Sequence, residues 1–250
     1  MMVIADTHVH LYPSYDTVRL LDGLHARLSV LAPGAVQAAF LTEGKGFRAF
    51  DDLSGRFGAW TVEPSPEPGC LLATCDDDAE MYIVAGRQIV TRERIEILSL
   101  ATSEMIADGQ IAHDTVNAVL EAGGVPVVGW APGKWFFGRG KIVASLIESC
   151  DPGQLAVGDT ILRATCWAEP LLMRAARRRG CTVLAGSDPL PFAGEEVRAG
   201  TYATVLEGAF DKQKPRSSLR ELLQAGSACT MGRRNGPVLM LQRLRKNAAT

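Results

Sequence analysis

The sequence lacks the features that mark several large classes of protein. It has no apolar run close to the roughly 20 residues of a membrane-spanning helix, and no charged leader with a cleavage site stands before the first strand-like residues, 3–6. Its formal net charge of −2 over 250 residues gives no reason to expect nucleic acid or an anionic membrane as a partner. We therefore expect a cytoplasmic protein that binds neither.

Cysteine is present but sparse. The six cysteines are scattered and include no Cys-x-x-Cys pair, so zinc-finger spacing and the density of a disulfide scaffold are both absent. We expect reduced, mostly buried thiols. With 47% hydrophobic and 22% charged residues the chain can bury a large core, and one α/β barrel accounts for residues 1–250 as a single domain.

Apolar, β-rich runs alternate with helical patterns along the chain. The predicted strands cover residues 3–6, 36–42, 81–91, 95–101, 125–129, 155–158 and 182–187; the predicted helices cover 16–31, 114–121, 142–149, 170–179, 198–210, 217–225 and 238–244. This alternation predicts parallel strands joined by right-handed crossovers in a nearly closed barrel, with an open doubly wound sheet as the alternative. Three prolines separate two short strand-like runs near residues 58–78, where we expect an inserted β-hairpin.

The most informative motif is Asp-Thr-His-Val-His at residues 6–10, at the end of the first predicted strand. Because side chains alternate along a strand, Asp6, His8 and His10 should point to one face. Two imidazoles two residues apart can reach one cation at about 2.0–2.1 Å if the strand ends at a cavity. Barrel enzymes also place their chemistry at the C-terminal ends of strands. The motif therefore predicts a metal site rather than a pair of surface histidines.

Carboxylates stand at the ends of two other predicted strands. Asp188 follows the strand 182–187, late enough in the chain for the last barrel strand to lie beside the first. We predict a metal ligand or a general base there, although Asp before Pro also commonly initiates a turn. Glu43 ends the strand 36–42 and is a third strand-end candidate.

Cations gather in residues 129–141, which mix glycines and aromatic residues between a predicted strand and a helix. Backbone amides there, with Lys134 and Arg139, could receive a phosphate or carboxylate group; a packed lid with solvated cations is the alternative. The spacing is not that of a Walker loop. Arg163 and Asp159 form a further strand-end polar pair, open between a substrate contact and a structural ion pair.

Together these segments resemble the PHP (polymerase and histidinol phosphatase) superfamily, whose members are distorted seven-stranded, TIM-like barrels that bind up to three divalent metal ions. The resemblance is diffuse but spans most of the chain. Residues 6–10 are similar to the opening His-x-His motif, and Gly-Ser-Asp at 186–188 resembles the closing Gly-Ser-Asp-x-His. Residues 85–89 and 95–100 resemble the third and fourth strands, and residues 130–133 the family's His-Pro turn. The resemblance implies a distorted (β/α)7 barrel.

The chain departs from the family at several ligand positions. Gln88 stands where the family has a metal-binding Glu, Glu96 where it has a His, Ala131 at the His of the His-Pro turn, and Leu190 at the closing His. The resemblance thus leaves His8, His10 and Asp188 as ligands, with Glu43 and Glu96 as substitutes. Two histidines and one or two carboxylates suffice for one Zn, Mn or Fe ion with open positions for water and substrate.

The resemblance implies a metal-dependent hydrolase, most of all a phosphoesterase that acts on a small phosphorylated substrate through a metal-activated water. Asp188 would bind the metal or take the proton, and Lys134, Arg139 or Arg163 would hold the anionic group. Two alternatives stay open. An amidohydrolase-type barrel also opens with His-x-His and closes with a strand-end Asp. A degenerate, non-catalytic binding or subunit protein would account for the missing histidines.

Overall fold

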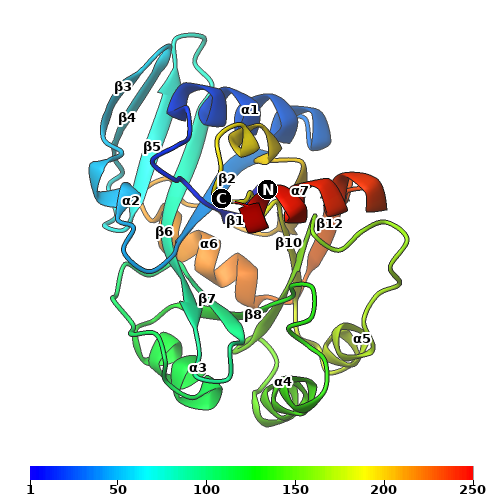
Figure 1. The fold of residues 1–250 in the computed structure, drawn as a ribbon. Helices are drawn as coiled ribbons and strands as arrows, with labels where there is room; N and C mark the ends of the chain where they lie inside the picture. The colour runs from blue at the N-terminus through cyan, green and yellow to red at the C-terminus, as the bar shows by residue number, and fades with distance from the viewer. Residues whose placement is uncertain (250) are drawn as a thin grey trace.

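A computed structural model describes residues 1–249 of the chain as one twelve-stranded sheet curled into a distorted, nearly closed TIM-like barrel, with helices outside it (Figure 1). The strands are β1 (Met2–Val9), β2 (Val36–Glu43), β3 (Gly55–Phe57), β4 (Trp60–Pro64), β5 (Cys70–Cys75), β6 (Glu80–Val90), β7 (Glu96–Leu100), β8 (Val125–Gly129), β9 (Ala156–Thr160), β10 (Val183–Gly186), β11 (Tyr202–Glu207) and β12 (Ala228–Gly232). The helices are α1 (Thr17–Leu31), α2 (Ala49–Asp52), α3 (Ala112–Glu121), α4 (Gly138–Ser149), α5 (Leu171–Arg178), η1 (Glu195–Arg198, 3₁₀), α6 (Pro215–Gln224) and α7 (Pro237–Ala249).

The seven predicted barrel strands are confirmed as β1, β2, β6, β7, β8, β9 and β10, in the sheet order β10-β9-β8-β7-β6-β2-β1-β11-β12. The prediction that all of them run parallel is wrong for β7, which is antiparallel to both β6 and β8. Only five residues, 91–95, connect β6 to β7. A parallel crossover needs a dozen or more, so this connection can only be a hairpin.

The inserted hairpin is confirmed as β4 and β5, which pair antiparallel between β2 and β6 in the chain. β3 extends it on one side, and β5 pairs with β6 on the other. These strands form the long ribbon beside α1 in Figure 1. The insertion therefore continues the barrel sheet without interrupting the strands that carry the predicted site.

The predicted helix over residues 198–210 is wrong. These residues form the end of η1 and then β11, which pairs antiparallel with β1. The segment between Gly200 and Gly208, both at positive φ, is rich in β-branched and aromatic residues, whose preference for strands outweighs its apparent helical periodicity. β12 then pairs with β11 and was absent from the sequence prediction.

The barrel closes between β1 and β10 through individual contacts, without a regular ladder. The Thr7 hydroxyl donates to the carbonyl of Ala185 at 3.1 Å, and the amide of Asp188 donates to the carbonyl of His8 at 2.8 Å. A Cβ on Gly186 would lie 2.4 Å from Cβ of His8 and 2.6 Å from its amide nitrogen. Glycine at this position is therefore what lets the end of β10 approach β1.

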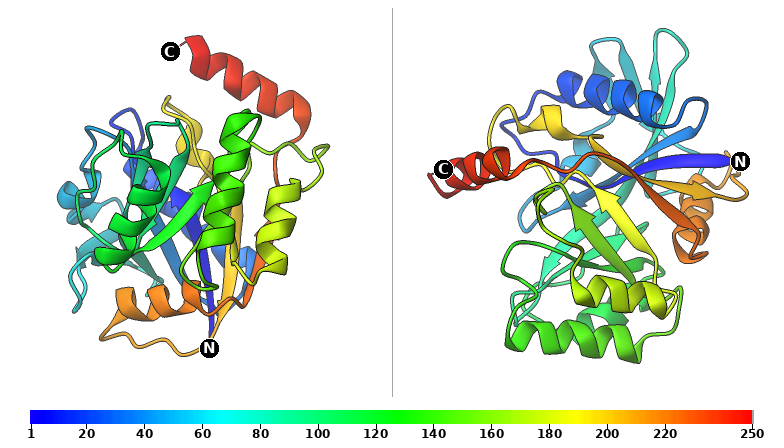
Figure 2. Two further views of the ribbon diagram at one scale, coloured as in Figure 1. Left: turned by 90° about the horizontal axis from the view of Figure 1, so that it is seen from below. Right: turned by 90° about the vertical axis from the view of Figure 1, so that its right-hand side faces the viewer.

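Apolar side chains fill the barrel and the layer beneath its helices. The interior is packed by residues such as Val3, Phe40, Leu98, Val127 and Leu184. α3, α4 and α5 cover the outer face of β8 to β10, and α1 packs outside β1 and β2 (Figure 2). All six cysteines are free. Within residues 1–249, no helix combines the length and apolar character that crossing a membrane requires.

Candidate metal centre

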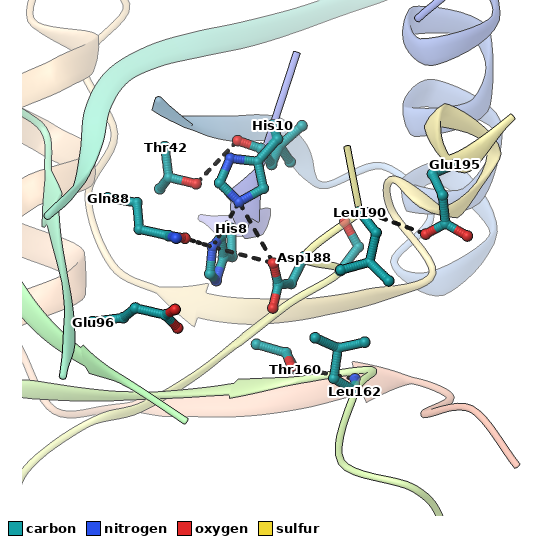
Figure 3. A network of polar contacts seen from close by, with 12 residues as sticks. His8, His10, Thr42, Gln88, Glu96, Thr160, Leu162, Asp188, Leu190 and Glu195 are labelled. Carbon is teal, nitrogen blue, oxygen red and sulfur yellow. Dashed lines mark hydrogen bonds and ion pairs between the residues drawn. The ribbon is translucent and has the colours of Figure 1, made fainter. Parts of the chain in front are cut away.

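His8, His10 and Asp188 meet at the C-terminal ends of β1 and β10 (Figure 3). The Nε2 atoms of the two histidines are 3.1 Å apart, and each lies 3.5 Å from Oδ1 of Asp188. The pairing of β1 with β2 shifts between Asp6 and Val9, where β1 carries an extra residue. Such a bulge re-aims side chains, and here the two rings lie edge to face with their Nε2 atoms converging.

The donor set fits a divalent cation. Ligand bonds of about 2.0–2.2 Å in tetrahedral geometry place neighbouring ligand atoms roughly 3.3–3.6 Å apart, which is close to the separations in this cluster. Without a cation, Nε2 of His8 faces Nε2 of His10, Oδ1 of Asp188 and Oε1 of Gln88 within 3.5 Å. A neutral imidazole nitrogen carries at most one hydrogen. The cluster therefore has more lone pairs than its hydrogens can satisfy, and a shared cation would resolve this excess.

The electrostatics of the cluster favour the protonation states that bind metals. Burial lowers the pKa of His8, opposed in part by the nearby Asp188 carboxylate. Burial alone would raise the pKa of Asp188, but the two imidazoles and Arg243 lower it to about 2. A neutral imidazole beside an ionised carboxylate is the state that metal coordination requires.

Asp188 is held in an unusual backbone conformation. Its φ is +47°, a left-handed region that Asp tolerates better than most residues but that is uncommon outside glycine. Its amide donates to His8, and Arg243 of α7 donates to its carbonyl at 3.3 Å. Arg243 is itself buried and paired with Glu195. Strain that the surroundings hold in place is typical of functional sites.

Asp6 belongs to the framework beneath the cluster and not to the cluster itself. Its Oδ1 accepts from the amides of Ser187 at 2.9 Å and His8 at 3.2 Å, and its Oδ2 accepts from the amide of Gly200 at 2.7 Å. Burial raises its pKa to about 6 although these hydrogen bonds act to lower it. Strand alternation predicted that Asp6 points to the same face as both histidines. Its carboxylate instead links β1 to β10 and to the start of β11.

Gln88 is the contact that sequence reasoning left out of the site. Its Oε1 lies 2.9 Å from Nε2 of His8, and Figure 3 shows it reaching the cluster from β6. The signal was present, since the resemblance aligns Gln88 with a metal-binding Glu. An amide oxygen is a weaker ligand for Zn, Mn or Fe than a carboxylate. Gln88 therefore offers His8 a polar but uncharged neighbour.

Glu96 and Lys134 form an ion pair at the edge of the site. Nζ of Lys134 lies 3.1 Å from Oε1 of Glu96, and both side chains are partly buried. Glu96 begins β7, and because that strand is antiparallel, its first residue lies at the same end of the barrel as the last residues of β1. Figure 3 shows its carboxylate on the His8 side of the cluster. Glu96 is close enough to raise the pKa of His8 but is not one of the three grouped ligands.

The other predicted residues are engaged by partners outside the cluster. Glu43 accepts from the amide of Phe50 at 2.9 Å and so holds the start of α2. Arg163 makes a bidentate pair with buried Asp159, with 2.7 and 2.5 Å contacts, and also donates to the carbonyl of Trp167. The structure thus gives Arg163 the structural ion pair that the sequence left open. Arg139 donates to the carbonyl of Gly133 within its own loop.

Residues 130–131 explain one missing ligand. Trp130 and Ala131 follow the last residue of β8, and Trp130 packs with residues of α4 and α5 outside the barrel. Ala131 is 9% exposed and offers no ligand atom. The position that the resemblance assigns to a histidine thus carries only a methyl group.

Solved structures share this architecture over nearly the whole chain. PsfC from Pseudomonas syringae is 14% identical, with a TM-score of 0.63, 99% of this chain and 98% of that chain covered. A two-domain protein from Bacteroides vulgatus containing a predicted PHP-like metal-dependent phosphoesterase is 12% identical, with a TM-score of 0.56 and coverages of 99% and 70%. The chain therefore has the PHP-like fold. The resemblance inferred from the motifs is confirmed at the level of fold.

A third structure with this fold is a lesion-specific endonuclease from Pyrococcus furiosus. It is 11% identical, with a TM-score of 0.51 and coverages of 92% of this chain and 58% of that chain. A complex of Endonuclease Q with a 27-mer duplex containing an abasic lesion matches at 10% identity and a TM-score of 0.51. No protein-family model and no curated protein matches the sequence.

Proposed function

We propose that the chain is a metal-dependent hydrolase with phosphoesterase activity, in which His8, His10 and Asp188 hold one divalent ion. The observation that carries this proposal is the convergence of three ligand atoms, 3.1–3.5 Å apart, at the functional end of a PHP-like barrel. At such an end, side chains from several strands surround one reacting centre. A small phosphorylated molecule is the substrate we propose.

The side chains around that centre would have different roles in the reaction. A bound divalent ion would supply Lewis acidity and a more acidic water. His8 and His10, fixed by β1, would hold the ion, and Asp188 would contribute a ligand oxygen or accept the proton of the attacking water. Lys134, paired with Glu96 at the edge of the site, would bind the phosphoryl oxygens. Arg163, committed to Asp159, has no part in this proposal.

A non-catalytic, metal-binding or subunit role is the competing proposal, and specific residues favour it. Ala131 and Gln88 replace ligands that the family resemblance expects, which leaves one three-residue cluster. An amidohydrolase-type reaction has less support, because it would use further histidines or a modified lysine on the intermediate strands. Among residues 1–249 the structure groups no such set with His8 and His10.

Hydrolysis of p-nitrophenyl phosphate in the presence of Zn, Mn or Fe(II) tests the proposal. We expect turnover by the wild type and a loss of about a hundredfold or more in the His8→Ala/His10→Ala variant, because the ligands of the ion are gone. His113→Ala is the matched control, since His113 lies in α3 with only a 3.3 Å contact to the Ser145 hydroxyl. It should retain full activity.

Three outcomes separate the competing roles. Cleavage of an anilide or lactone without cleavage of phosphate esters would replace the phosphoesterase by an amidohydrolase-type activity. Metal bound without any turnover would favour the non-catalytic role. Equal turnover by the wild type and the His8→Ala/His10→Ala variant would contradict the placement of the site.

Lys134→Gln should raise KM for the phosphate ester more than it lowers kcat, because it removes a binding charge.

A further inference from the structure

A cavity separate from the metal centre lies outside the barrel between α1, η1 and the segment that joins β12 to α7. Its volume is about 610 Å³. Figures 1 and 2 show α1, η1 and α7 close together around this region. Tyr202 pairs with Gly232, and Ala5 with Thr204, so β11 begins and β12 ends beside the C-terminal end of β1. The cavity therefore opens at the same end of the barrel as the metal centre, but on the outer side.

The charge of this cavity is of one sign. Its walls include four arginines and no acidic residue: Arg27, Arg198, Arg233 and Arg234. Arg233 is exposed and the other three are partly buried. None of the four makes an ion pair with a carboxylate within the described residues 1–249, although four buried or partly buried cations elsewhere in the chain do. Like charges gathered without counter-charges repel one another. An anion bound among them would remove that repulsion.

Polar atoms in the wall also lack acceptors. Nε of Arg198 and Nδ2 of Asn235 are buried and have no hydrogen-bond partner in the described part of the chain. Asn235 is only 8% exposed, so its amide cannot rely on bulk water. Unpaired buried donors are rare and costly. By contrast, Arg234 donates to carbonyls of the 163–167 loop and Arg27 to the carbonyl of Ala199, which fixes the wall around the two unsatisfied groups.

The cavity has an apolar side as well. Ala26, Val30, Leu31 and Leu239 also line it, and Val30 is 79% exposed. Arginine binds phosphate-type oxyanions through paired N–H groups, and an apolar wall favours a ligand with a hydrocarbon or aromatic body. The combination distinguishes this cavity from a merely solvated cationic surface.

We propose that this cavity binds a small organic molecule that carries a phosphate-type oxyanion, with Arg198 and Arg233 as the principal anion ligands and Asn235 in support. The site shares no residue with the metal centre. It is joined to it through Asp6, which accepts from the amide of Gly200 in the cavity wall and from the amide of His8. The proposal does not depend on hydrolysis at the metal centre.

Calorimetric titration of phenyl phosphate and of inorganic phosphate into EDTA-treated protein, at constant ionic strength, tests this site. Removal of metal excludes binding at the His8 cluster. We expect phenyl phosphate to bind more tightly than inorganic phosphate, because only the former also uses the apolar wall. Arg198→Gln/Arg233→Gln should weaken binding by about tenfold or more, as charge-assisted hydrogen bonds are lost. Arg245→Gln, an exposed arginine of α7 outside the cavity, should leave it unchanged.

Thermal unfolding without ligand separates a binding role from a structural one. If the arginines form a binding site, Arg198→Gln/Arg233→Gln should unfold at the same temperature as the wild type or higher, because it relieves repulsion, and should lose the stabilisation by phenyl phosphate. The proposal is overturned if the wild type binds neither probe, if the double variant binds as well as the wild type, or if Arg245→Gln weakens binding equally.

Discussion

Two sides of the barrel rim use similar polar residues in different ways. At the ends of β1 and β10, His8, His10 and Asp188 point at one another within 3.5 Å and leave lone pairs unsatisfied. At the ends of β2 and β7, Glu43 and Glu96 are already engaged, with the amide of Phe50 and with Lys134. A carboxylate at a strand end thus becomes a ligand candidate only when its local partners do not satisfy it.

The side formed by His8, His10 and Asp188 depends on the close approach of the backbones of β1 and β10. Gly186→Ala should disrupt this approach and have the largest effect. The new Cβ would lie within 2.4–2.9 Å of Cβ, N and Cα of His8. We expect a loss of about 2–4 kcal/mol in the free energy of unfolding and a loss of metal binding, because β10 must move away from β1. Denaturant unfolding measures the first effect. Gly138→Ala, which meets no atom within 4 Å, is the control.

The side formed by His8, His10 and Asp188 also depends on Asp6. Asp6→Asn should lower the free energy of unfolding by less than Gly186→Ala does. The carboxylate accepts from three backbone amides, whereas an asparagine presents an NH₂ group toward at least one of them. An unsatisfied buried donor costs about 1–3 kcal/mol. Asp16→Asn serves as the control, because Asp16 caps α1 and Asn caps equally well. Equal stability of the Asp6→Asn variant and the wild type would show that Asp6 is not the tie described above.

Gln88→Glu should convert the neutral neighbour of His8 into a charged ligand. In metal-free protein the new carboxylate would stand near buried Asp188, so we expect a lower free energy of unfolding. With metal, affinity should rise by about tenfold or more, because a carboxylate replaces an amide. Competition titration with a chelator measures the affinity. A fall in affinity would mean that the side chain of residue 88 does not face the ion.

The smallest effect is expected on the side formed by Glu43 and Glu96. Glu43→Gln keeps an oxygen that can accept from the amide of Phe50, so stability should change by no more than about 0.5 kcal/mol. Metal affinity should not change. A clear loss of bound metal in this variant, measured by elemental analysis after dialysis, would instead place Glu43 among the ligands and contradict the distinction between the two sides.

The sequence was most informative where local patterns decide structure. Seven barrel strands, the hairpin at 58–78 and the joining of β1 to β10 through Asp188 were predicted from short apolar runs and strand-end motifs. The direction of β7 was not, because a short apolar run looks the same in a parallel and an antiparallel strand, and the short 91–95 connection decides between them. The helix predicted over 198–210 failed because strand preference and two glycines at positive φ prevail there.

Within the site, residue type and strand position identified which residues to consider but not which of them are free. The competition for Glu43 comes from α2, and that for Arg163 comes from Asp159, with Tyr202 donating to the same carboxylate. Tyr202 is far from Arg163 in the chain. The ion pair of Arg163 with Asp159 was one of the two roles that the spacing left open, but a tertiary partner such as Tyr202 cannot be read from spacing, whereas the His-x-His pair carries its own geometry.

A crystal structure of the protein grown with Zn, with anomalous data at the metal edge, tests the central claim most directly. The account predicts one anomalous peak about 2.0–2.2 Å from Nε2 of His8, Nε2 of His10 and a carboxylate oxygen of Asp188, and no such peak in the His8→Ala/His10→Ala variant. A peak held by Glu43 or Glu96 without the histidines, or no peak in crystals of the Zn-equilibrated wild type, would contradict it.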